Sequence, residues 1–334
     1  GKVGGKPLFN SVALLRNGKV QRIFHKRLLP TYDVFDEDRY FEPGEESNFF
    51  TLEISESSES TVISHSVRIG VTICEDFWND EKFWGKRNYP DNPVAELVAK
   101  EIDLLVNLSA SPFAVGKQKL REAMIEHSAI QYGLPIIYTN QVGGNDDLIF
   151  DGSSVACDRS GNLVGRANAF ASDLLVLEFN LATQDFLPGE IKPQLECADA
   201  EIWAALVLGV RDYAQKCGFK QAVIGLSGGI DSALVAAIAS QALGAENVLG
   251  VLMPSPYSSE HSITDALELA KNLGISTQTL PIETAMQTFD RILAPLFTGT
   301  ETDITEENLQ SRIRGNLLMA IANKFGHLLL STGN

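Results

Sequence analysis

The sequence predicts an α/β protein made of two domains. Strand-like apolar runs alternate with helical runs along most of the chain, which is typical of sheets covered by helices. A glycine-rich string at residues 225–232 separates one such strand from an alanine-rich helix. A polar stretch with prolines, residues 185–197, has the composition of a linker. A chain of 334 residues is long enough to form two hydrophobic cores.

Composition restricts the classes of function. The formal net charge is −16 at pH 7, and 44% of the residues are hydrophobic. An acidic chain disfavours binding to nucleic acid or to an anionic membrane, but a local loop can still bind an anionic nucleotide. No run approaches the roughly 18 apolar residues of a membrane span. We therefore expect small-molecule substrates, no nucleic acid and no membrane.

The cysteines and the chain ends indicate the setting. Cys74, Cys157, Cys197 and Cys217 form no Cys-x-x-Cys pair and no cluster with histidine. This spacing predicts neither a zinc site nor a disulfide framework, and we expect a reducing, cytoplasmic setting. The chain starts without Met or a signal peptide and stops just after an apolar run. We expect both ends to cut through folded domains.

The first predicted domain covers residues 1–184. A hairpin is expected over residues 8–23, with its turn at Asn17-Gly18, and a solvent-facing hairpin edge over residues 53–66. Periodicity predicts further strands at residues 67–73, 104–108, 136–139, 153–157 and 174–178. It predicts helices at residues 93–100 and 117–132. The strand at residues 67–73 would deliver Cys74 at its C-terminal end.

The second predicted domain covers residues 198–334. Strands are expected at residues 222–224, 248–252, 277–282 and 327–331. One helix is expected at residues 198–216 and another directly after the glycine-rich string. Two more are expected at residues 262–273 and 308–325. A strand–helix succession with a phosphate loop after its first strand predicts a doubly wound parallel sheet.

The glycine-rich string has the layout of a phosphate-binding loop. Its residues are Gly225, Leu226, Ser227, Gly228, Gly229, Ile230, Asp231 and Ser232. A strand, a glycine turn and a helix N-terminus direct free backbone N–H groups at an anion, and the serines add hydroxyl donors. Asp231 would bind a magnesium ion that bridges phosphate oxygens. The plainer interpretation is a tight connection of small residues.

This string lacks the Gly-Lys-Ser/Thr of a Walker loop. Ser-Gly-Gly-Ile-Asp-Ser instead resembles the PP-loop of the ATP pyrophosphatases, which adenylate an acceptor and release pyrophosphate. The resemblance implies that residues 225–232 bind ATP.

Cys74 is the sharpest single residue of the first domain. On its own, a cysteine that ends a buried strand is as often a small core residue as a nucleophile. However, Lys26 lies in Lys-x-x-Leu-Pro, Cys74 in Ile-Cys-Glu-Asp-Phe-Trp, and Ser111 in Ser-Ala-Ser-Pro-Phe. Together these motifs resemble the nitrilase (carbon-nitrogen hydrolase) superfamily over nearly all of residues 1–180. With residues 35–41 added, the segment resembles more narrowly the glutaminase domain of glutamine-dependent NAD synthetases.

This resemblance implies an αββα sandwich and a Glu-Lys-Cys triad. A thiolate attacks the carboxamide of glutamine, and Lys26 lowers the pKa of Cys74 and stabilises the developing oxyanion. Tyr32, Ser111 and Lys117 correspond to glutamine-binding groups, although Lys117 could instead be a solvated helix start. The family's general-base glutamate precedes the lysine, and residues 1–26 contain no glutamate. We expect that glutamate to lie outside this chain, the alternative being an inactive glutaminase.

The second domain adds three likenesses to NAD synthetases. Residues 252–262 resemble the loop that flanks the adenosine of ATP, residues 307–315 the helix beside deamido-NAD, and residues 330–334 the beginning of a Thr-Gly-Asn-Lys-Ser-Glu motif. The resemblance assigns Asn308 to deamido-NAD and Thr332 to ATP. It implies ATP as a substrate, Mg²⁺ and a homo-oligomer.

The resemblance therefore implies ATP-dependent amidation of deamido-NAD through an NAD-adenylate, with ammonia from glutamine and release of AMP and pyrophosphate. Two alternatives stay open. One is another PP-loop amidotransferase, such as a GMP or asparagine synthetase. The other is a non-catalytic scaffold that binds nucleotides.

Overall fold

The structure is a computed structural model that describes residues 5–58, 61–301 and 303–333. It divides into two compact units, each treated by itself below. The first comprises Gly1–Gly143 with Leu148–Glu201, and the second comprises Gly144–Asp147 with Ile202–Asn334. Among the described residues, no helix is both long enough and apolar enough to cross a membrane.

The first unit is centred on a six-stranded mixed sheet with the order β10-β9-β6-β5-β4-β3. These strands are β3 (Phe49–Ser58), β4 (Thr61–Ile73), β5 (Leu104–Ser109), β6 (Ile136–Asn140), β9 (Val155–Cys157) and β10 (Leu163–Arg166). β4, β5 and β6 are parallel neighbours, and the other pairs are antiparallel. The three parallel strands therefore end at the same edge of the sheet.

Among the described residues, six strands of two to seven residues lie outside that sheet as three separate pairs. β1 (Ser11–Arg16) pairs with β2 (Lys19–His25) through the predicted turn, where Asn17 and Gly18 both have positive φ. β11 (Phe179–Asn180) pairs with β12 (Asp185–Phe186). The last pair is β7 (Val142–Asn145) with β8 (Leu148–Asp151).

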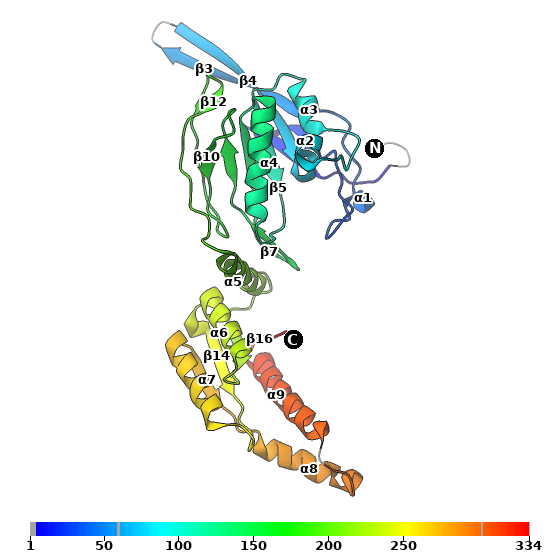
Figure 1. Ribbon diagram of the computed structural model, residues 1–334, viewed down its shortest axis with the longest axis vertical. Coiled ribbons are helices and arrows are strands. Elements are labelled where there is room, and N and C mark those ends of the chain that lie inside the picture. The colour runs from blue at the N-terminus through cyan, green and yellow to red at the C-terminus, as the bar shows by residue number, and fades with distance from the viewer. Residues whose placement is uncertain (1–4, 59–60, 302, 334) are drawn as a thin grey trace. The chain divides into compact units, whose positions relative to one another are not determined.

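Side chains alternate between the two faces of the six-stranded sheet. Leu105 and Ile136 join the core under the helices, whereas their neighbours Leu104 and Ile137 join the core on the opposite face. The helices of this unit are α1 (Glu37–Tyr40), α2 (Glu81–Trp84), α3 (Pro93–Val98) and α4 (Lys117–Tyr132). α3 and α4 cover one face, and Figure 1 shows α4 running along the sheet.

The strand predicted at residues 174–178 is wrong. The backbone there forms no strand, and β11 begins only at Phe179. The alternation of side chains is nevertheless present, because Leu174 and Val176 are 86% and 78% exposed while Leu175 and Leu177 lie against Gly165. The apolar period of two was real, but periodicity cannot show whether a ladder partner exists.

The second unit is a doubly wound α/β domain. Its strands are β13 (Ala222–Gly225), β14 (Val248–Leu252), β15 (Ser276–Thr279) and β16 (Leu328–Leu330), all parallel, in the order β15-β14-β13-β16. The strand order therefore reverses at β13, the place where ligands bind in such sheets. The predicted α/β class is confirmed in both units.

Helices cover both faces of this sheet. α6 (Ile230–Leu243) and α7 (Glu260–Leu273) pack on one face, and α8 (Glu283–Phe297) and α9 (Ile304–Phe325) on the other. α5 (Ala198–Lys216) precedes β13. Small residues such as Ala236 and Ala266 let α6 and α7 approach the strands closely. Figure 1 shows α8 and α9 as a helical hairpin.

The helices α8 and α9 differ most from the prediction. α8 was not predicted, and α9 begins four residues before the expected start at residue 308. Asp303 and Glu306 form a capping box that bonds the first free N–H groups of α9. This Asp-x-x-Glu spacing was the missed signal for the helix start.

We predict that Ile136→Ala destabilises the first unit. Ile136 is fully buried in the core that Phe77 and Tyr138 share, so truncation leaves a cavity costing about 2–5 kcal/mol. Urea unfolding followed by tryptophan fluorescence measures the loss, because Trp78 and Trp84 pack against the same core. Leu174→Ala, at an exposed site, is the control and should change the unfolding free energy by less than about 0.5 kcal/mol. Equal effects of the two variants would contradict the prediction.

Candidate active sites

Cys74 lies where β4 ends and a single 3₁₀ turn, Cys74–Phe77, begins. Its φ is +46°, a left-handed conformation that cysteine rarely adopts and that must be held by its surroundings. Asn107 of β5 helps to hold it, since Asn107 Nδ2 donates to Cys74 O at 3.4 Å and to Thr72 Oγ1 at 3.0 Å. Ser109 Oγ in turn donates to Asn107 Oδ1 at 2.6 Å. A buried polar network therefore supports the strained residue.

Lys26 follows β2, and its side chain is fully buried. Lys26 Nζ lies 2.6 Å from Glu37 Oε1, where α1 begins. Asn10 Nδ2 donates to the other carboxylate oxygen of Glu37 at 3.3 Å. The ammonium thus has a fixed carboxylate partner, as a buried charge requires.

The pKa of Cys74 is raised, chiefly because the thiol is buried. The Lys26 charge lowers this pKa, as the sequence predicted, and so does a hydrogen bond from Ser109. The negative charges of Glu75 and Glu37 raise it again. Burial wins, so the resting side chain is a thiol, and attack by sulfur requires a group that takes its proton.

Tyr32 and Glu75 are bonded to each other beside Cys74. Tyr32 Oη donates to both carboxylate oxygens of Glu75, at 3.0 and 2.9 Å. Burial is the first cause that raises the pKa of Glu75, and hydrogen bonds from Tyr32 and Tyr89 oppose it. Glu75 is therefore held by phenol groups, and Tyr89 is a neighbour that the sequence did not single out.

Ser111 and Lys117 lie in the segment that follows β5. Ser111 is buried, and its N–H donates to Asn140 Oδ1 at 2.9 Å. Lys117 is the first residue of α4, and its ammonium donates to Pro112 O at 3.0 Å and lies 5.7 Å from the ring centroid of Trp78. Burial lowers the pKa of Lys117. Among the described residues no carboxylate lies within ion-pair distance of this ammonium, which leaves it able to bind an anion.

The second unit has a cavity of about 530 Å³ at the carboxyl ends of β13, β14 and β16. Seven of the nine residues predicted to bind ATP line it: Gly225, Leu226, Ser227, Gly229, Asp231, Ser232 and Thr332. Gly228 and Ile230 do not line this cavity, and neither does Asn308. Ile230 points outward and is 81% exposed.

Gly228 is required by the close approach of α7. Its φ is +81°, and a Cβ placed on it would lie 2.3 Å from Ser262 O, which no side chain tolerates. Serine hydroxyls brace the same loop, since Ser232 Oγ donates to Gly229 O at 2.9 Å and lies 3.1 Å from Ser227 Oγ. The loop is thus shaped in advance, with the N-terminus of α6 at the cavity wall.

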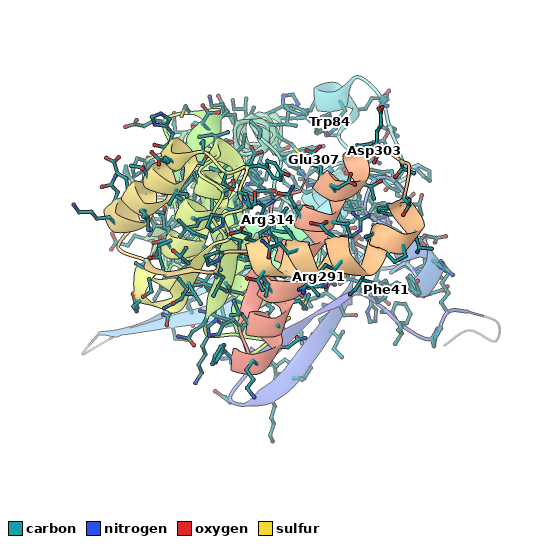
Figure 2. All side chains as sticks on the ribbon, turned by 90° about the horizontal axis from the view of Figure 1, so that it is seen from below. Phe41, Trp84, Arg291, Asp303, Glu307 and Arg314 are labelled. Atoms are coloured by element: carbon teal, nitrogen blue, oxygen red, sulfur yellow. The ribbon has the colours of Figure 1, made fainter. Side chains whose placement is uncertain are left out.

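Taken alone, Arg314 would be interpreted as a surface helix charge, although residues 307–315 resemble the helix beside deamido-NAD; in the structure Arg314 lines the cavity. Its Nε donates to Met253 O, just beyond β14, at 3.1 Å, and burial lowers its pKa. Figure 2 labels Arg314 among the side chains of α9. Arg312 differs, because it is exposed and its Nη1 bonds Asn308 O one turn earlier. Arg312 and Arg314 are two residues apart on α9, so they lie on different faces of the helix, and the motif alone could not show which of them faces the cavity.

The comparisons with known proteins agree with these geometries. The carbon-nitrogen hydrolase family model matches residues 2–187, more than half of the chain, and the chain therefore belongs to the carbon-nitrogen hydrolase family. The NAD synthase family model matches residues 202–334.

The relatives that share both parts are glutamine-dependent NAD(+) synthetases. The Synechocystis enzyme is 58% identical over 99% of this chain and 57% of its own length. The Thermotoga maritima enzyme is 42% identical over 98% of this chain and 58% of its own. The chain thus spans little more than half the length of these relatives.

A solved structure agrees with the fold across both units. Glutamine-dependent NAD+ synthetase from Acinetobacter baumannii, in complex with ADP, is 41% identical, with a TM-score of 0.84 over 98% of this chain and 57% of that one. A second such structure, from Cytophaga hutchinsonii, has 21% identity and a TM-score of 0.73 and supports the fold alone.

We predict opposite effects of the two charges on Cys74. Lys26→Met should raise the pKa of Cys74, because the cation that favours the thiolate is removed, and Glu37→Gln should lower it. The pH dependence of alkylation by iodoacetamide, quantified by mass spectrometry on the Cys74 peptide, measures both. Lys19→Met, at an exposed position of β2, is the control. Shifts of the same sign in both variants would contradict the electrostatic account.

We predict that Gly228→Ala loosens the loop before α6. The clash with Ser262 and the positive φ together cost at least about 1–3 kcal/mol, so amides of residues 226–236 should exchange about 5- to 150-fold faster. Hydrogen exchange followed by mass spectrometry measures this. Gly218→Ala, which also has positive φ but open space around its Cβ, is the matched control. Unchanged exchange in Gly228→Ala would mean that the loop tolerates a side chain.

Proposed function

We propose that this chain provides parts of both catalytic centres of a glutamine-dependent NAD(+) synthetase. Residues 1–184 are its glutaminase domain, residues 185–197 the linker, and residues 198–334 the ATP-binding synthetase domain. The reaction is the ATP-dependent amidation of deamido-NAD to NAD, with nitrogen from glutamine. One observation carries the proposal: the same chain contains a buried lysine whose charge acts on Cys74, and a preformed phosphate loop. The relatives that share both halves support it.

In the glutaminase half, Cys74 is the nucleophile. Its sulfur attacks the carboxamide carbon of glutamine, ammonia leaves, and water then hydrolyses the thioester to glutamate. Lys26 stabilises the oxyanion, with Glu37 holding its ammonium in place. Because the resting Cys74 is a thiol, a base must accept its proton before or during attack.

Tyr32, Ser111 and Lys117 bind the substrate glutamine. The ammonium of Lys117, which donates to Pro112 O, suits the carboxylate of an amino acid, and its partial burial strengthens that contact. Tyr32 is half-exposed, with its hydroxyl fixed on Glu75, so that its ring can form one wall of the substrate site.

In the synthetase half, residues 225–232 and Thr332 bind ATP. The nicotinate carboxylate of deamido-NAD attacks the α-phosphorus, and pyrophosphate leaves. Ammonia then attacks the acyl carbon of the adenylate, and AMP leaves. The N–H groups at the start of α6 and the serine hydroxyls take up the charge of the pyrophosphate. Asn308 binds deamido-NAD.

Asp231 fits a magnesium ion that arrives with ATP. It is the carboxylate of the loop that lines the cavity, and the described residues contain no cluster of three acidic or other metal-ligating side chains. One carboxylate is enough for Mg²⁺, which keeps several waters and phosphate oxygens as its other ligands. The ion would neutralise charge on the leaving pyrophosphate. We further propose a cytoplasmic location and a homo-oligomeric assembly.

We predict that two variants separate the nitrogen sources. In the intact protein, Cys74→Ala should lose at least about 10³-fold of the glutamine-driven rate and keep the ammonia-driven rate. Asp231→Ala should lose both rates, because the adenylation that precedes nitrogen transfer fails. NAD formation, measured with each donor in turn, tests both variants. Cys217→Ala, at an exposed cysteine, is the control.

Four outcomes would contradict parts of the proposal. Glutamine-driven NAD formation by Cys74→Ala would remove the nucleophile, and ammonia-driven formation by Asp231→Ala would remove the magnesium role. Pyrophosphate release from ATP should also require deamido-NAD. Release driven by xanthosine monophosphate or aspartate would favour a GMP or asparagine synthetase instead, and no release with any acceptor would favour a nucleotide-binding scaffold.

A further inference from the structure

The carboxylate of Asp76 joins two separate segments of the first unit. Asp76 is 1% exposed and lies two residues after Cys74. One oxygen, Oδ2, accepts the N–H of Ile73 at 3.1 Å. The other, Oδ1, accepts the N–H groups of Arg27 and Leu28 at 3.0 and 2.8 Å. The bond to Leu28 spans 48 residues of sequence.

This tie matters because no strand pairing aligns the two segments. Within the residues that the structure describes, β2, which leads into Lys26, pairs with β1 alone, whereas β4, which leads into Cys74, belongs to the six-stranded sheet. Backbone bonds hold Lys26 to Asn10 and Gly44, and Asn48 O accepts the N–H of Val71 in β4, so side-chain bonds are what tie the residues next to Lys26 directly to those next to Cys74. Asn48 ties the preceding residue, with its Nδ2 donating to His25 O at 2.8 Å. Asp76 ties the two residues that follow.

A local turn cap would need only the bond to Ile73. The oxygen that reaches Arg27 and Leu28 does something else, because both amides flank the catalytic lysine rather than the turn. Burial raises the pKa of Asp76 to about 6, and the three N–H bonds and the Lys26 charge oppose that rise. A buried carboxylate with a donor set of this kind is well suited to bind backbone on two sides.

We propose that Asp76 is a positioning residue that fixes the Lys26 ammonium beside the Cys74 thiol by bonding the backbone next to each. The catalytic roles of these two residues rest on the function proposed above. The tie itself is a property of the fold, so it can be tested without glutamine.

Asp76→Asn cuts the tie at nearly constant volume. An amide has one acceptor oxygen, so it can bond Ile73 or the Arg27–Leu28 pair, while its NH₂ group opposes the remaining N–H donors. The readout is the pKa of Cys74 from the pH dependence of alkylation. If Asp76 positions Lys26, this pKa should rise in Asp76→Asn. If Asp76 acted only through its own negative charge, removal of that charge should lower it.

A double-mutant cycle identifies the lysine as the group that moves. The rise caused by Lys26→Met should shrink to less than a third in the Asp76→Asn background, because the ammonium is no longer near the sulfur. Asp103→Asn is the matched control, since Asp103 also accepts a backbone N–H, from Arg68 at 2.7 Å, before β5 begins. It should leave the Cys74 pKa and the effect of Lys26→Met unchanged. Additive shifts, or a fall of the pKa in Asp76→Asn, would overturn the proposal.

A second measurement decides the matter if Asp76→Asn does not fold by circular dichroism. In the unmodified chain, residue-resolved hydrogen exchange should show Arg27 and Leu28 protected at least tenfold more than Val34, which is exposed. Equal exchange at these positions would refute the tie.

Activity then separates this inference from the proposed function. In the intact protein, Asp76→Asn should lower kcat with glutamine and spare the ammonia-driven rate. The expected alkylation shifts could be found while the unmodified protein shows no glutamine-driven activity. That combination would support the positioning role of Asp76 and reject the proposed function.

Discussion

Lys26 carries an ammonium group that is buried away from water, and the candidate site of the first unit is arranged to stabilise that buried charge. A buried charge is tolerated only with a partner, and Glu37 supplies one at 2.6 Å. The partner has a consequence for chemistry. Glu37 raises the pKa of Cys74 while Lys26 lowers it, so the ion pair delivers less net positive field at the sulfur than a lone lysine would. Burial then keeps the cysteine protonated, and proton transfer becomes part of the nucleophilic step.

Both units place their functional groups at the carboxyl ends of parallel strands. In the first unit, Cys74 follows β4 and Ser111 follows β5. In the second, the glycine-rich loop follows β13 and Thr332 follows β16. Because parallel strands end at a common edge, residues far apart in sequence come together at one site, whereas the opposite ends of the strands contribute to stability. The reactions proposed for the two units are unrelated, but in both units the ends of parallel strands bring the site residues together.

The sequence predicted most of the fold because each element carried its own local signal. Most of the parallel strands were apolar, the polar β15 being the exception, and α4 and α5 have the predicted bounds. Residues 174–178 failed because an alternating pattern says nothing about a ladder partner. α8 was missed, although its apolar positions recur at helical spacing and pack on α9.

Motifs predicted the chemistry-bearing residues better than their surroundings. Lys26 and Cys74 could be chosen from local sequence, and their roles stay predictions. The supports could not be chosen, because Asp76 and Asn140 act on backbone groups 48 and 29 residues away. The direction in which the Cys74 pKa shifts could not be predicted either, because it depends on how far the fold buries the sulfur. Arg314 needed the helix register before it could be told from Arg312.

The backbone at Cys74 has one further meaning. A φ of +46° suits glycine, and a cysteine there holds strain of order 1–3 kcal/mol. Folding by itself would therefore favour glycine at this position, and the reaction proposed for Cys74 supplies a reason for a thiol to occupy it. Backbone stability would favour glycine at residue 74, whereas the proposed chemistry requires a thiol. The bonds from Asn107 to Cys74 O and from the Ile73 N–H to Asp76 stabilise the strained backbone that the thiol requires.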